Sequence, residues 1–282
     1  MRMKSWAAIG AGVLLLGGVA LALHLTRERI DHRRGGGERV PLGRVDHSAY
    51  DALLQKYVDD QGLVAYRRWH DAAADREALS AYISRLGDVD LKAEAPREAQ
   101  LAYWINAYNA LTLEFILNKY PLGSIQEYVS EVPVPGKFHV WRDVRLEVDG
   151  DWYTLDDMEH RVLRKQIGEP RIHFALVCAS RGCPPLRNRA YTTADIDAQL
   201  TDNARRFFAQ PTNFRAEPGD HTVHLSQLLG WYGGDFARTP AERARALRGY
   251  FPEKLDWLDA PDLLVECDLP YDWRLNDQRP ER

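Results

Sequence analysis

Cysteine is scarce in this sequence, and its scarcity excludes a fold held together mainly by disulfide bonds. The 282 residues contain three cysteines, Cys178, Cys183 and Cys267, so at least one thiol has no partner within the chain. A chain of this length buries a core that is stable without such bridges. A disulfide between Cys178 and Cys183 remains an open alternative if the intervening turn brings their Cα atoms close enough.

An excess of positive charge is also lacking. The chain has 37 Lys and Arg residues against 41 Asp and Glu residues, a net charge of −4, and no long basic run occurs in it. Proteins that bind nucleic acids need a concentrated basic surface to neutralise the phosphates. The composition therefore argues against nucleic acid as a partner.

The spacings CxxC and HxxxH, which are typical of strong metal sites, are absent. His221 and His224 are predicted to lie on opposite faces of one strand, where they cannot share an ion. A site built from His139, His160, His173 and the cysteines is the weaker alternative. We expect no metal and no other cofactor.

One long apolar run is present, at residues 6–23, between the basic start MRMK and a second basic, polar segment. Its length approaches the roughly 20 residues that span a bilayer, so residues 1–30 are predicted to be a signal anchor or a signal peptide cleaved near residues 20–22. The arginines after the run favour a cytoplasmic domain. Because the N-terminus resembles a signal, we instead expect a domain anchored in the inner membrane and facing the periplasm, or secreted there.

The next residues predict a linker followed by one domain. Residues 31–45 are rich in Gly and charge and have no apolar periodicity, which is typical of a flexible linker. Residues 46–282 are predicted to form a single globular domain that folds without the membrane segment.

The strongest predicted helix covers residues 96–119, where apolar side chains leave only a narrow polar stripe. Asn106 and Asn109 lie on one side of it, and a buried amide must find hydrogen-bonding partners. They either bond to neighbouring backbone or line a site. Further helices are predicted near residues 46–57, 75–86, 193–209 and 240–250.

Several strands are predicted around this helix. Residues 144–154 read as a hairpin that turns at Asp149 and Gly150, and a helix starts near Leu155, capped by Thr154 or Asp156. Residues 172–178 read as a buried strand that ends at Cys178, because two prolines follow Cys183. Short strands near residues 214, 223 and 263–267 and a Gly-rich turn at 231–236 complete a single α+β domain, with its central, mostly buried helix packed on a mixed or antiparallel sheet.

Five motifs resemble those of one protein family. In chain order they are YWINAYNAL, YTLDDMEHRVLR, RIHFALVCASRGCPPL, WYGGDF and YDWRLND, and together they extend from Gln100 to Asp277. This combination resembles the domain-of-unknown-function 547 family, which has no settled biochemical activity and whose bacterial members commonly look exported. The resemblance assigns polar motif positions to Asn106, Asn109, Glu159, His160, Arg164, His173, Cys178 and Ser180. It also implies that other members carry Ser where this chain has Cys183.

The residue types allow a cysteine-centred hydrolase or acyl-transferase site. Cys178 is the expected nucleophile, His160 the expected base, and Asn106 the group that orients the imidazole or stabilises an oxyanion. Five further residues are expected to bind the ligand or to orient the catalytic groups, namely Asn109, Glu159, Arg164, His173 and Ser180. The alternative is a non-enzymatic binding or scaffold module at the membrane, in which these side chains form a structural polar network. Its partner, a protein or a small molecule, is not readable from the sequence.

Overall fold

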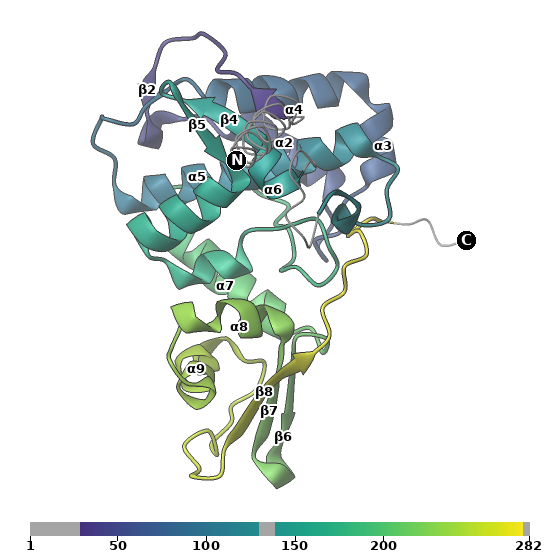
Figure 1. The fold of residues 1–282 in the computed structure, drawn as a ribbon, viewed down its shortest axis with the longest axis vertical. Coiled ribbons are helices and arrows are strands. Elements are labelled where there is room, and N and C mark those ends of the chain that lie inside the picture. The colour runs from purple at the N-terminus through teal and green to yellow at the C-terminus, as the bar shows by residue number, and fades with distance from the viewer. Residues whose placement is uncertain (1–28, 130–138, 279–282) are drawn as a thin grey trace, which may run out of the picture.

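A computed structural model describes residues 29–129 and 139–278 of the chain, and Figure 1 shows their arrangement. In this part of the chain, no helix combines the length and the hydropathy needed to cross a membrane. The apolar run at residues 6–23 lies outside the described residues, as does most of the predicted membrane segment. The helices are α2 Ser48–Tyr57, α3 Tyr66–Asp71, α4 Ala73–Leu86, α5 Arg97–Lys119, α6 Val140–Asp143, η3 Asp157–Ile167, α7 Ile196–Phe208, α8 Gln227–Tyr232 and α9 Pro240–Leu247.

The central helix α5 confirms the prediction of a mostly buried helix. Its side chains from Leu101 to Leu117 are all buried, as expected for a helix with apolar residues on nearly every face. It packs mainly against α4 and η3, and it also meets β4, Val144–Val148. Other helices, rather than a broad sheet, therefore form most of its support.

The strands form three small sheets instead of one. The first is mixed, with β1 Ile30–His32 parallel to β4 and β4 antiparallel to β5 Asp151–Thr154. The second pairs β2 Val40–Pro41 with β3 Val89–Asp90, and the third has the order β6 Phe214–Glu217, β7 Thr222–Ser226 and β8 Leu264–Leu269. The predicted hairpin is confirmed. In Figure 1 the third sheet lies with α8 and α9 at the end of the molecule away from α2–α5, and the chain after β8 returns toward α3.

The segment predicted as a linker packs against the domain. β1 and β2 each pair with a strand of the domain, and the Arg34 Nε donates to Asp88 Oδ1 at 2.9 Å. The imidazole of His32 lies 3.0 Å from the buried carboxylate of Glu114. Backbone pairing and ion pairs thus fix a segment whose Gly-rich composition suggested a free tether.

The prediction of a strand at residues 172–178 is wrong. Residues Pro170–Phe174 form a 3₁₀ helix, and the chain then runs without regular structure to Cys178. The Asn109 amide donates to the Ala175 carbonyl and accepts from the Val177 N–H, both at 3.0 Å, and the Asn203 amide donates to the Phe174 carbonyl. Since side chains satisfy these buried backbone groups, no neighbouring strand is needed.

The helix predicted to begin near Leu155 is present as the π-helix η3. The Thr154 hydroxyl accepts from the Asp157 N–H at 3.0 Å, while Asp157 Oδ2 accepts from the Thr154 N–H at 3.1 Å, so Thr154 is the residue that caps it. π-Helices are rare and often occur at functional sites. Glu159, His160 and Arg164 all lie on this helix.

Candidate functional site

A cavity of about 230 Å³ lies where η3, the cysteine loop 178–184, α8 and the segment after β8 meet. Four of the predicted site residues line it, namely Glu159, His160, His173 and Cys178. The wall also contains residues that we did not predict as site residues from the sequence. Among them are Tyr108, Trp141, Asp156, Cys183, Trp231, Tyr232, Tyr271 and Trp273.

The two thiols of the cysteine loop share one hydrogen-bond cluster. The Sγ atoms of Cys178 and Cys183 lie 2.8 Å apart, and both cysteines are free. The Cys183 sulfur also accepts from the Cys178 N–H at 3.0 Å and lies 2.9 Å from the Tyr271 hydroxyl. The Ser180 hydroxyl lies 2.8 Å from the Tyr271 hydroxyl and 3.3 Å from the Cys183 sulfur, so Ser180 and Tyr271 both lie within hydrogen-bond distance of that sulfur.

This geometry stabilises a thiolate on Cys183. Burial alone would raise its pKa, but the hydrogen bonds from Cys178, Ser180 and Tyr271 lower the pKa of Cys183 to about 6. The hydrogen bond to Cys183, together with burial, raises the pKa of Cys178 well above its ordinary value. The lowered pKa thus belongs to Cys183 and not to Cys178, the nucleophile expected from the sequence, and the contact favours an S–H···S⁻ hydrogen bond from Cys178 to Cys183.

Backbone geometry fixes this cluster in place. Ala179 has a positive φ of 60°, which few non-glycine residues adopt and which turns the chain directly after Cys178. Gly182 lies so close to the segment after β8 that an added Cβ would come within 2.7 Å of the Asp272 nitrogen. Ser180 also bridges to Leu275. The closing motif YDWRLND thus holds the cysteine loop and supplies Tyr271 to it.

Two histidines of the cavity wall, His160 and His173, belong to a chain of polar and charged groups. Asp235 accepts from the Arg164 guanidinium at 2.6 and 2.8 Å, and its Oδ2 lies 2.7 Å from His173 Nε2. Arg164 also lies 2.9 Å from His160 Nδ1. Arg164 therefore pairs with Asp235, a carboxylate from a distant segment of the chain. No hydrogen bond joins His160 to either sulfur among the residues that the structure describes.

Glu159 is a buried carboxyl group on η3. Its side chain is buried and hydrogen-bonded to Tyr232, and burial raises its pKa despite the opposing effect of His160. A raised pKa favours the protonated form of a carboxyl, which is the form that can donate a proton. Its place on the cavity wall makes Glu159 a candidate general acid.

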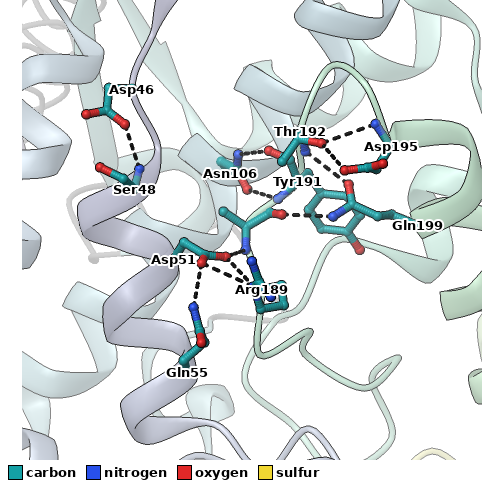
Figure 2. Close-up of polar contacts among 11 residues, drawn as sticks. Asp46, Ser48, Asp51, Gln55, Asn106, Arg189, Tyr191, Thr192, Asp195 and Gln199 are labelled. Atoms are coloured by element: carbon teal, nitrogen blue, oxygen red, sulfur yellow. Dashed lines mark hydrogen bonds and ion pairs between the residues drawn. The ribbon is translucent and has the colours of Figure 1, made fainter.

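The two predicted asparagines bond to backbone and do not line the cavity. Asn106 donates to the Tyr191 carbonyl at 2.8 Å and accepts from the Tyr191 N–H at 3.0 Å (Figure 2). Asp51 and Gln199 hold the adjacent residues of the same segment. Asn106, which we expected to orient an imidazole, has its amide occupied away from the cavity, while Asn109 holds the backbone that leads into Cys178.

One set of side chains in the described residues has the arrangement of a metal site. His224, Glu266 and Asp268 bring their ligand atoms within 4.8 Å of one another on neighbouring strands β7 and β8. None of the three lines the cavity. Within the described ranges, the alternative set of His139, His160, His173 and the cysteines forms no such group.

The motif resemblance has support from a comparison with protein families. Residues 92–208 match the family model described as a protein of unknown function, DUF547. This match confirms the predicted family. It covers the first three motifs of the DUF547 resemblance, and the motifs that supply Asp235 and Tyr271 lie beyond it. No curated protein and no solved structure matches the chain.

We predict that the domain loses stability in mild acid because its buried His173 must take up a proton on unfolding. Burial lowers its pKa to about 4, against 6.5 for a free imidazole, so the unfolded chain binds more protons between these two pH values. The free energy of unfolding should therefore fall as pH drops through this window, by about 3 kcal/mol for this group. His173→Gln should show a smaller fall between pH 7 and 4 in urea titrations. His47, whose pKa burial also lowers to about 4, is the matched site, and His47→Gln should reduce the fall similarly. An unchanged pH profile in both variants would contradict the assignment.

Proposed function

We propose that the domain is a cysteine-dependent enzyme that transfers or hydrolyses an acyl group, with Cys178 as its nucleophile. One observation carries the proposal: Cys178 lies half-buried on the cavity wall with its sulfur 2.8 Å from the sulfur of Cys183. A weak nucleophile needs an adjacent base. The Cys183 thiolate fills that role, which the sequence alone had given to His160.

The reaction begins when the Cys178 sulfur attacks a carbonyl carbon. Its S–H proton moves to Cys183, and the C=O π bond becomes an oxyanion. Tyr108 lines the cavity and its hydroxyl accepts from Trp141 Nε1 at 3.1 Å, so its own proton is available to that oxyanion. The oxyanion then collapses, the bond from the carbonyl carbon to the leaving group breaks, and Glu159 gives that group its proton, while His160 donates a hydrogen bond to the substrate. Water or a second acceptor next attacks the acyl carbon and loses a proton to Glu159. The C–S bond breaks, and the Cys178 sulfur takes its proton back from Cys183.

The alternative of a binding or scaffold module has an observation in its favour. Asn106, Asn109 and Asn203 all use their amides on backbone, as a purely structural network would. This network does not involve the cavity-facing sulfur of Cys178. The two functions therefore differ in whether Cys178 forms a covalent intermediate.

A panel of nitrophenyl esters and thioesters with short acyl groups tests the proposal. We expect a burst of leaving group and an intact-mass increase that peptide mapping assigns to Cys178. Cys178→Ser should abolish the burst, and Cys267→Ser, away from the cavity, should leave it unchanged. A chain that binds these esters without any acyl adduct would support the scaffold function instead.

We further propose that residues 1–30 hold the domain at the inner membrane on its periplasmic side. The proposal rests on the apolar run at 6–23, which has no polar face to pack on a domain. Fusing alkaline phosphatase after residue 282, a reporter active only in the periplasm, should give an active enzyme in the membrane fraction. An active reporter in the soluble periplasm would indicate cleavage, and an inactive one would place the domain in the cytoplasm.

A further inference from the structure

Two cysteine sulfur atoms in contact can form a disulfide, which is a reaction distinct from acyl transfer. The Sγ atoms of Cys178 and Cys183 are 2.8 Å apart, and a disulfide requires about 2.05 Å. Closure therefore needs a movement of less than an ångström between side chains already facing each other. We propose that Cys178 and Cys183 are a redox pair that reduces small organic disulfides in the cavity and closes into a 178–183 disulfide.

The two thiols differ in the way that this activity requires. Cys178 is half-buried and borders the cavity, so it meets the substrate first. Cys183 is only 4% exposed and is held by the Cys178 N–H and by Tyr271, so it is placed behind the attacking sulfur. A thiolate kept ready by hydrogen bonds resolves a mixed disulfide quickly. Cys183 is accordingly the resolving thiol.

The wall of the cavity indicates the substrate class. Trp231 is 51% exposed, and its ring lies 5.0 Å from that of Tyr271 and 5.9 Å from that of Trp273. Such a group of aromatic faces binds planar, apolar groups better than strongly hydrated ones. The wall carries groups of both signs, Arg142 and Asp156 among them, so it offers no surface of one charge for a highly charged substrate. We infer an aromatic, weakly charged disulfide rather than an acidic peptide disulfide.

The electron balance closes with the substrate and one reductant. The Cys178 sulfur attacks one sulfur of R–S–S–R, its proton passes to Cys183, and the first thiolate leaves. Cys183 then gives up that proton to the departing thiolate and attacks the Cys178 sulfur, which expels the second thiolate. The second thiolate takes a proton from water, so the pair has lost two electrons and the one proton that it shared, and the substrate has become two thiols. A dithiol reductant restores the pair by the reverse exchange.

The test uses the full chain carrying Cys267→Ser, fully reduced, with 2,2′-dithiodipyridine as the aromatic disulfide. We expect two thiopyridones per chain and a mapped 178–183 disulfide. With Cys183→Ser or Cys183→Ala added, we expect one thiopyridone and a stable mixed disulfide on Cys178. With dithiothreitol as reductant, turnover should exceed the free reaction by about tenfold or more, and glutathione disulfide should react more slowly.

Cys183 also borders a second cavity lined by Arg181 and Arg274, so the order of attack is open to test. If the Cys178→Ser chain forms the mixed disulfide on Cys183 as fast as the parent reacts, the assignment of roles is overturned. Two mixed disulfides on one chain, with no 178–183 bond, would overturn the redox pair itself. The proposal does not rest on acyl transfer, because ester turnover and disulfide reduction are measured separately and either can fail alone.

Discussion

Replacing Cys183 with Ser should raise the pH at which the first thiolate of the pair forms, which the pKa of Cys183 sets at about 6. In the wild-type chain the negative charge rests on Cys183, which receives hydrogen bonds from the Cys178 N–H and the Tyr271 hydroxyl. The Cys178 sulfur also lies 3.2 Å from the Tyr271 hydroxyl, but its burial disfavours the charged form. Without Cys183, the remaining thiol keeps this burial and should therefore titrate at a higher pH than the pair does.

The ultraviolet absorbance of the thiolate, followed from pH 5 to 10 in a Cys267→Ser background, measures this midpoint. Cys178→Ser is the matched control, since Cys183 keeps its backbone donor and Tyr271 and should keep a low midpoint. A low midpoint that survives Cys183→Ser and disappears in Cys178→Ser would show that Cys178 carries the charge. That outcome would restore the sequence-based expectation and return the role of base to another group.

Helices and turns could be predicted from the sequence where a single local pattern of side chains determines them. Apolar residues on nearly every face identify α5, and the sequence Asp149-Gly150 identifies the hairpin, with both residues at positive φ. The stretch 172–178 has an equally clear apolar pattern, and the prediction of a strand failed there. Its backbone partners are Asn109 and Asn203, which are distant in sequence and which no local pattern reveals.

The candidate site was predictable only in part for the same reason. Cys178, His160, His173 and Glu159 belong to motifs visible in the sequence, and the fold brings them to one cavity. The groups that set their chemistry come from further away: Tyr271 lies 93 residues from Cys178, and Asp235 lies 62 residues from His173. Both belong to quoted motifs, WYGGDF and YDWRLND, which was the one available signal. The contacts themselves depend on packing that spacing does not encode.

Replacing Asn109 with Leu should destabilise the domain by about 2 to 6 kcal/mol, although the two side chains have similar volumes. The Asn109 amide is 2% exposed and makes two hydrogen bonds of 3.0 Å, one to the Ala175 carbonyl and one from the Val177 N–H. Leucine satisfies neither backbone group, and each buried group left without a partner costs about 1 to 3 kcal/mol. Asn118 lies exposed on the same helix, so Asn118→Leu should change the denaturant midpoint little.

Replacing Asn109 with Leu should also change the titration of the thiol pair. Because Val177 precedes Cys178, release of its N–H should loosen the approach to the thiol pair, and thiol alkylation in the Asn109→Leu chain should then lose its low-pH midpoint. Asn106→Leu should lower stability by a similar amount, since its amide also makes two backbone bonds, but it acts at Tyr191 and should leave the thiol midpoint near pH 6. Equal effects of the two substitutions on the thiols would mean that general loosening of the fold, rather than the placement of residues 175–177, controls the site. Unchanged denaturant midpoints in both variants would contradict the role of these amides.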